Sequence, residues 1–102
     1  MIFKNIKFDK KPYGGWRSKT FLGGDLEISI VAGSHCYSTP REDLDDPFSY
    51  TKYEIAIFRN GEFTQEFFDG GDHNDGDVMG WVSPDEIVTL IKKIQNGFIR
   101  QS

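Results

Sequence analysis

The chain has 102 residues and a formal net charge of −4, with 37% hydrophobic and 27% charged residues. This length suits a single domain over residues 1–102, and the hydrophobic content excludes an intrinsically disordered chain. The acidic balance argues against direct binding to nucleic acid, whose phosphates require a positive surface. Cys36 is the only cysteine, which excludes an internal disulfide and favours a reducing, cytoplasmic location. No apolar run reaches membrane-spanning length and residues 1–9 lack the apolar core of a signal peptide, so no membrane association is expected.

The first third of the chain predicts β-strands. Residues 2–8 alternate loosely and predict a first strand, which fits an edge position. The runs 16–22 and 26–32 flank Gly23-Gly24-Asp25, a favourable three-residue hairpin connection. If Leu22 lies opposite Leu26, one face is apolar and the other mostly polar, as in a sheet packed on one side. The apolar face collects Trp16, Leu22, Leu26, Ile28, Ile30 and Ala32, and the other collects Arg17, Lys19, Glu27 and Ser29 with Phe21 and Val31.

A second hairpin is predicted in the middle of the chain. Residues 53–59 and 62–68 flank Asn60-Gly61, whose residue types accept the positive φ angles of a type I′ turn. A two-residue turn pairs Arg59 with Glu62, Phe58 with Phe63 and Ile57 with Thr64. Neither face of this hairpin is wholly polar. One face therefore carries the core, and the other is either covered by loops or available to a partner.

The end of the chain predicts a helix. Residues 78–82 can form a short strand, and Ser83, Pro84 and Glu86 form a helix start with a capping box. An apolar stripe follows, and Asn96-Gly97 is predicted to end the helix. The stripe consists of Ile87, Leu90, Ile91 and Ile94. The fold class predicted is α+β, an antiparallel β-sheet of about five strands, including two hairpins, packed against one C-terminal α-helix.

Two irregular acidic segments separate these elements, residues 34–51 and residues 69–77. The second segment offers clustered carboxylates, but it fails the EF-hand pattern in either register, so no metal site is predicted. Cys36 beside His35, with His73 elsewhere, gives only three zinc-type ligands, and an inert cysteine is expected. No phosphate loop, dinucleotide fingerprint or nucleophile elbow is present in the sequence, so neither a cofactor nor catalytic residues are predicted.

The candidate functional residues are instead those of a protein-binding surface. Tyr13, Trp16, Tyr37, Phe48 and Tyr50 are expected to be exposed aromatics, and binding surfaces are rich in Tyr and Trp. Acidic groups in the two irregular segments would steer the protein towards a basic partner surface, such as that of a nucleic-acid-binding enzyme. The predicted contact residues are Tyr37, Glu42, Asp43, Asp45, Asp46, Phe48, Tyr50, Asp72 and Asp75.

Three stretches resemble short accessory proteins of bacteriophages and prophages. They are Pro12-Tyr13-Gly14-Gly15, Tyr53-Glu54-Ile55-Ala56-Ile57 and the segment 77–87, DVMGWVSPDEI. The resemblance assigns no role to any residue. It implies a non-enzymatic protein that acts in the cytoplasm of a bacterial host cell by binding a host protein, as an inhibitor of a defence system of the anti-CRISPR kind. The alternatives are a structural or regulatory phage component and a small metal- or cysteine-dependent enzyme; the oligomeric state stays open.

Overall fold

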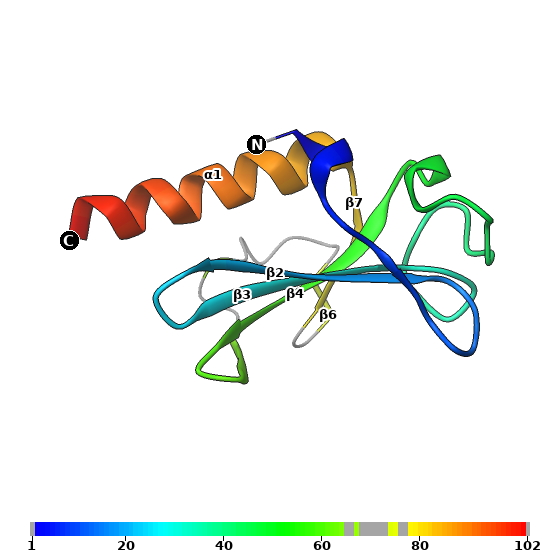
Figure 1. Ribbon diagram of the computed structural model, residues 1–102, viewed down its shortest axis with the longest axis horizontal. Helices are drawn as coiled ribbons and strands as arrows, with labels where there is room; N and C mark the ends of the chain where they lie inside the picture. The colour runs from blue at the N-terminus through cyan, green and yellow to red at the C-terminus, as the bar shows by residue number, and fades with distance from the viewer. Residues whose placement is uncertain (1, 65–66, 68–73, 76–77, 102) are drawn as a thin grey trace.

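The two predicted hairpins form the centre of one antiparallel sheet, and one long helix crosses a single face of that sheet (Figure 1). The computed structural model describes residues 2–64, 67, 74–75 and 78–101. The strand order is β1-β2-β3-β4-β7-β6, and β5 also pairs with β4. This arrangement confirms the predicted α+β fold. The strands are β1 (Asp9–Lys10), β2 (Trp16–Gly23), β3 (Leu26–Ala32), β4 (Tyr53–Arg59), β5 (Glu62–Thr64), β6 (Asn74–Asp75) and β7 (Val78–Val82), followed by the helix α1 (Pro84–Gln101).

The hairpin of β2 and β3 has the predicted faces but a different register at its turn. Trp16 pairs with Ala32 and Thr20 with Ile28, and a register shift then places Gly23, rather than Leu22, opposite Leu26. The prediction of a Leu22–Leu26 pair is therefore wrong. The shift keeps Leu22 and Leu26 both buried on the core side. Gly23 has a φ of 118°, a conformation that residues with a side chain rarely adopt.

The hairpin of β4 and β5 has the predicted turn and register. Asn60 and Gly61 have φ angles of 54° and 80°, and Phe58 lies opposite Phe63. The two hairpin turns also contact each other, because an Arg59 guanidinium nitrogen lies 3.0 Å from Asp25 Oδ1 and the Asn60 backbone N–H donates to the Asp25 carbonyl. These contacts hold the two hairpins in register at the turn end of the sheet.

The core lies between the sheet and α1. Isoleucines of the helix pack on isoleucines of β3 and β4, and all of them are buried. The predicted capping box forms: Glu86 N donates to Ser83 Oγ at 3.2 Å, and Ser83 N donates to Glu86 Oε1 at 3.3 Å. Leu90 is only partly buried. The helix contributes Ile87, Ile91 and Ile94, and the sheet contributes Ile28, Ile30, Ile55 and Ile57.

The prediction of a strand over residues 2–8 is wrong. The N-terminal segment forms a 3-10 turn, η1 (Phe3–Asn5), and joins the sheet only at Asp9 and Lys10. Ile6 is buried in the core, while Phe3 and Phe8 pack on Tyr53 with ring centroids at 5.0 and 5.9 Å. The segment thus fills one end of the core with apolar side chains and does not extend along an edge.

Two further predicted boundaries also change. The helix does not end at Asn96-Gly97 but continues to Gln101. A glycine inside a helix costs only about 1 kcal/mol relative to alanine, and no proline follows it to break the helix. Asn74 and Asp75, predicted as loop, form the short strand β6 beside β7. The rest of the acidic loop, residues 69–73 and 76–77, lies outside the described residues.

In the described part of the chain, no helix has the length and apolar character required to cross a membrane.

The packing predicts unequal effects along the helix stripe. Ile91→Ala removes a fully buried side chain and should lower the free energy of unfolding by about 2–5 kcal/mol. Leu90→Ala should cost clearly less, because Leu90 is only partly buried. Urea unfolding of both variants measures this difference, with the exposed Lys92→Ala as the control. Equal losses for Leu90 and Ile91 would contradict the helix orientation described here.

Candidate binding surface

The face of the sheet that points away from α1 carries an exposed row of phenylalanines at the turn end. Side chains alternate along a strand, so the neighbours of the buried Ile28 and Ile57 point to this open face. Phe21 lies opposite Glu27, Glu27 opposite Phe58, and Phe58 opposite Phe63. We call Phe21, Phe58 and Phe63 the aromatic row. Figure 1 shows that no described helix covers this side of the sheet.

The aromatic row is unusually accessible for its residue type. Phe21 is 68% exposed and Phe63 is 52% exposed. Phe58 and Phe63 are in ring contact, with centroids 4.6 Å apart and an interplanar angle of 38°. Side chains that served only the core would be buried on the helix side, so the row exposes apolar area that the core does not use.

A shallow hollow of about 280 Å³ opens between Phe21 and Phe58. Its charged groups are two carboxylates, of which Asp25 is paired with Arg59 at 3.0 Å. The second is Glu27, whose carboxylate has no hydrogen bond or ion pair with any described residue. Phe21, Gly24, Asp25, Leu26, Glu27, Phe58 and Gly61 line the hollow.

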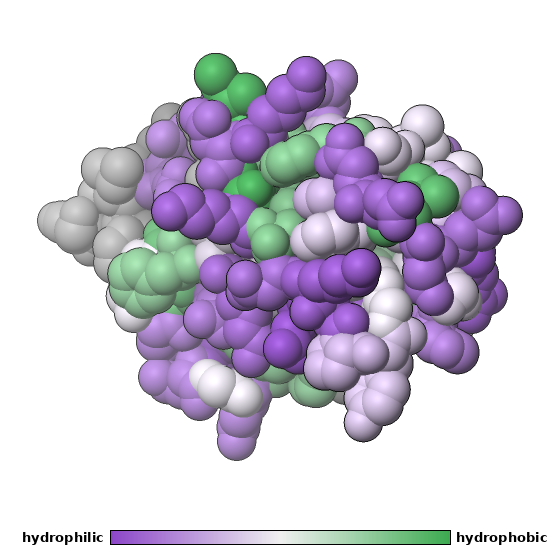
Figure 2. Space-filling view, turned by 45° about the vertical axis from the view of Figure 1, so that its right-hand side comes forward, coloured by the Kyte–Doolittle hydropathy of each residue, from purple (hydrophilic) through white to green (hydrophobic). Residues whose placement is uncertain are grey.

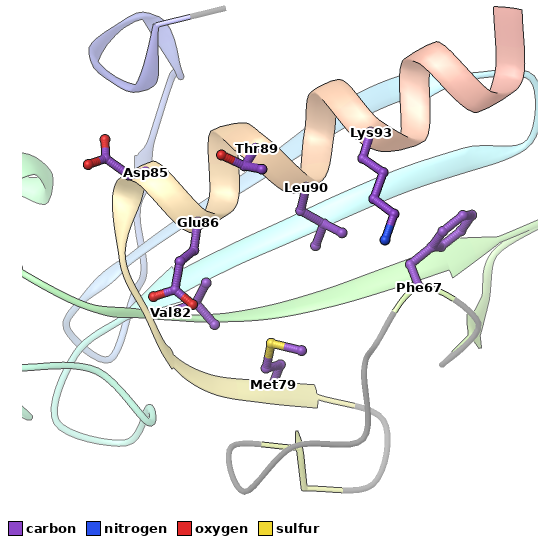
Figure 3. Close-up of a pocket in the computed structure, with 8 residues that line it drawn as sticks. All are labelled: Phe67, Met79, Val82, Asp85, Glu86, Thr89, Leu90 and Lys93. Atoms are coloured by element: carbon purple, nitrogen blue, oxygen red, sulfur yellow. The ribbon is translucent and has the colours of Figure 1, made fainter.

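A second cavity, of about 360 Å³, lies on the helix side of the sheet between α1 and β7. Leu90 and Lys93 extend from the helix on the side where Met79 and Phe67 lie (Figure 3). One acidic group at its rim, Glu86, already accepts the capping hydrogen bond from Ser83 N. The cavity therefore combines an apolar floor with a few solvated charges. Its lining consists of Phe67, Met79, Val82, Asp85, Glu86, Thr89, Leu90 and Lys93.

The predicted acidic surface, residues 34–51, is an ordered loop held by its own side chains. Asp43 accepts hydrogen bonds from Ser34 N at 2.9 Å and Ser34 Oγ at 3.0 Å. These bonds lower the pKa of the Asp43 carboxyl, the backbone bond having the largest effect. Asp43 also lies against Gly14, where a Cβ would fall 2.5 Å from Asp43 Oδ2. Asp46 Oδ1 accepts from Phe48 N at 2.9 Å and caps the short turn η2 (Pro47–Ser49).

The aromatic residues predicted for this loop are less exposed than expected. Tyr50 is 3% exposed, so its prediction as an exposed anchor is wrong. Its hydroxyl donates to the Glu42 carbonyl at 2.6 Å and accepts from Leu44 N at 2.9 Å, which closes the loop from inside. Phe48 is partly buried against Phe3 and Phe8.

Tyr37 joins the loop to β7. Its ring stacks on Trp81 with centroids 5.0 Å apart, and the Arg41 guanidinium lies 5.2 Å from the Tyr37 ring centroid. Trp81 N donates to the Tyr37 carbonyl at 2.9 Å, and Trp81 has a φ of 53°, beside a register shift between β4 and β7. The stacked pair of Tyr37 and Trp81 therefore joins the loop to β7 and is in part accessible at the surface.

Glu42 and Asp45 remain exposed, as predicted. Asp72 lies outside the described residues, and only the backbone of Asp75 is described, in β6. Figure 2 views the molecule from the side on which this loop lies and shows a largely hydrophilic surface with small, separate hydrophobic patches. Of the predicted aromatic contact residues, all of which the structure describes, Tyr50 is buried and Tyr37 and Phe48 are partly buried.

Cys36 is buried, and Lys11 Nζ lies 3.3 Å from its sulfur. Burial raises the pKa of the Cys36 thiol, and the hydrogen bond from Lys11 opposes this effect only in part. The thiol is thus protonated at neutral pH, which is the unreactive form. Among the residues whose placement is described, no three His, Cys, Asp or Glu side chains are grouped so as to hold a metal ion.

Sequence reasoning placed Phe21 on the polar face of the first hairpin and Phe58 with Phe63 on one face of the second. It did not bring them together, because nothing local specifies that β3 pairs with β4. A register that sets Glu27 opposite Phe58 would have revealed the row.

Comparisons with protein-family models, curated proteins and solved structures find no match to this chain.

The role of Asp43 predicts a pH-dependent stability difference. The pKa of Asp43 is lower in the folded than in the unfolded protein, so its contribution is present above about pH 4, the ordinary value for Asp. This contribution is lost as the pH falls through the lowered pKa. Asp43→Asn should therefore reduce the urea midpoint at pH 7, and the difference from the parent should shrink towards pH 3.

Asp45→Asn is the matched control, because Asp45 is exposed and accepts no hydrogen bond from a described residue. A pH-independent difference for Asp43→Asn, or an equal loss for Asp45→Asn, would contradict the assigned role.

Proposed function

We propose that this chain is a non-enzymatic binding protein that docks on another protein through the aromatic row on its open sheet face. The observation that carries the proposal is the alignment of Phe21, Phe58 and Phe63 in one cross-strand row, with Phe21 and Phe63 more than half exposed. Partly exposed aromatics on a rigid sheet offer large contact areas with little loss of side-chain entropy on binding.

The net charge of the chain favours a basic partner surface. The chain has a net charge of −4, and Glu27 lies within the row, while Lys19 and Arg17 lie farther along the same face of β2. An acidic protein associates faster with a positively charged surface than with a neutral one. The resemblance to phage accessory proteins supplies a context in which such a partner is a host protein. The nucleic-acid groove of a bacterial defence nuclease has the required positive charge.

Cysteine chemistry receives less support than binding. The buried Cys36 has a raised pKa, whereas a nucleophilic cysteine requires an accessible thiolate. A structural or regulatory phage component would also use a docking surface. The proposed surface therefore applies to that alternative as well, with a different partner.

The proposal is tested by comparative capture from a bacterial host lysate followed by mass spectrometry. Phe21→Ser with Phe63→Ser should abolish the retention of proteins that the parent retains, because both exposed anchors are removed. Tyr13→Ser is the control, since Tyr13 is 89% exposed and lies in the loop between β1 and β2. It should leave retention unchanged. Circular dichroism and urea unfolding establish that the double variant is folded.

A third variant, Glu42→Lys with Asp45→Lys, tests the acidic loop as the contact. Loss of retention in this variant, with retention preserved in the phenylalanine variant, would move the contact to residues 34–51 and overturn the proposal. No protein retained by the parent above the level of a blank resin would also count against it.

A further inference from the structure

The hollow between Phe21 and Phe58 has the chemistry of a site for a single cationic side chain. Directly opposed residues on neighbouring antiparallel strands have Cβ atoms about 4.5–5.5 Å apart. Glu27 is directly opposed to Phe21 on one side and to Phe58 on the other. Glu27 therefore lies on the open face between two aromatic residues, and it lines the hollow.

The charge of Glu27 is not neutralised within the described structure. Asp25, the other carboxylate of the hollow, is paired with Arg59. Lys19 follows on the same face of β2, opposite Ser29, and makes no ion pair with Glu27. Glu27 is partly buried, and a cation placed over it would be attracted both by the carboxylate and by the faces of the neighbouring rings.

We propose that this hollow binds an arginine side chain of the partner protein, an inference that rests on the proposed function. A guanidinium group is planar and weakly hydrated, stacks on aromatic faces, and donates two parallel hydrogen bonds to a carboxylate. Phe21 and Phe58 supply the aromatic walls, and Glu27 supplies the carboxylate. A lysine ammonium forms the ion pair but is more strongly hydrated and cannot stack as a plane, so arginine is favoured over lysine.

The neighbouring residues match a side chain rather than a larger ligand. The hollow has a volume of about 280 Å³, at the small end of the range of about 300–1,000 Å³ usual for small-molecule pockets, and this volume is sufficient for one side chain. Phe63 extends the apolar surface beyond Phe58 and is exposed enough to cover the aliphatic part of the arginine or a residue next to it.

The inference is tested by titrating ¹⁵N-labelled protein with a capped Gly-Arg-Gly peptide and following backbone amide shifts. Shifts should concentrate at Phe21, Glu27 and Phe58, with millimolar affinity because one side chain supplies the whole contact. Gly-Lys-Gly should bind more weakly. A Gly-citrulline-Gly peptide, which keeps the shape of arginine without its charge, should cause no specific shifts.

Glu27→Gln should weaken binding of the arginine peptide about tenfold, the order expected for loss of a charged hydrogen-bonded pair at a partly exposed site. Glu62→Gln is the matched control: it removes the same charge from β5, and Glu62 does not line the hollow. Phe21→Leu keeps apolar volume but removes one ring, and should also weaken binding. Equal arginine affinity for the parent and Glu27→Gln, or equal shifts with citrulline, would overturn the inference.

The same variants separate this inference from the proposed function. If the lysate partner is lost with the Phe21/Phe63 variant but retained by Glu27→Gln, the aromatic row is the docking site and the arginine assignment is wrong. If the arginine peptide binds as described but partner retention does not depend on Phe21 and Phe63, the hollow binds arginine and the proposed docking surface is wrong.

Discussion

A single helix can cover only one face of a sheet, and this constraint shapes the rest of the molecule. Ile87, Ile91 and Ile94 pack on the isoleucines of β3 and β4, so the apolar alternation of both strands is directed to one side. The opposite side is left to solvent and to loops. Polar residues are expected there, and Arg17, Lys19 and Glu27 meet the expectation. The aromatic row does not meet this expectation. Its phenylalanines lie on a face where the core does not require apolar side chains.

The acidic loop shows how charged residues can serve structure before function. Asp43 ties the middle of the loop to Ser34 at its start, and Asp46 caps η2, so two of the carboxylates are part of the loop's own hydrogen bonding. The Tyr50 hydroxyl and the Trp16 indole bond to backbone atoms of the same segment, at 2.6 Å from the Glu42 carbonyl and 2.9 Å from the Leu44 carbonyl. Asp, Ser and Pro in an irregular segment thus reflect turn chemistry. Within residues 41–46, the carboxylates of Glu42 and Asp45 are those that accept no hydrogen bond from a described residue of the loop.

Local sequence rules predicted the elements whose information is local. The Asn60-Gly61 turn specifies positive φ at adjacent positions, and Ser83 with Glu86 specifies a helix start, so both were predicted with their hydrogen bonds or registers. The failures involve competition between distant parts of the chain. A register shift beside Gly23 leaves both Leu22 and Leu26 in the core, and Ile6 is buried there instead of lying in an edge strand. Tyr50 was predicted at the surface because nothing local shows that its ring lies 5.7 Å from that of Tyr53.

The candidate site could not be predicted from the sequence, because it too depends on contacts between distant parts of the chain. Its charged and aromatic residues would contribute to binding in different ways. The row exists only once β3 pairs with β4, a long-range event that alternation within one strand cannot encode. Under the proposed function, the acidic charge spread over the surface acts at a distance, and salt screens it over about 8–10 Å. The aromatic row and Glu27 act only on contact. Rim charges mainly set association rates, whereas desolvated contacts mainly set dissociation rates. Under this proposal, Glu42 and Asp45 mainly raise the rate at which a basic partner associates. Phe21, Phe63 and Glu27 mainly lower the rate at which it dissociates.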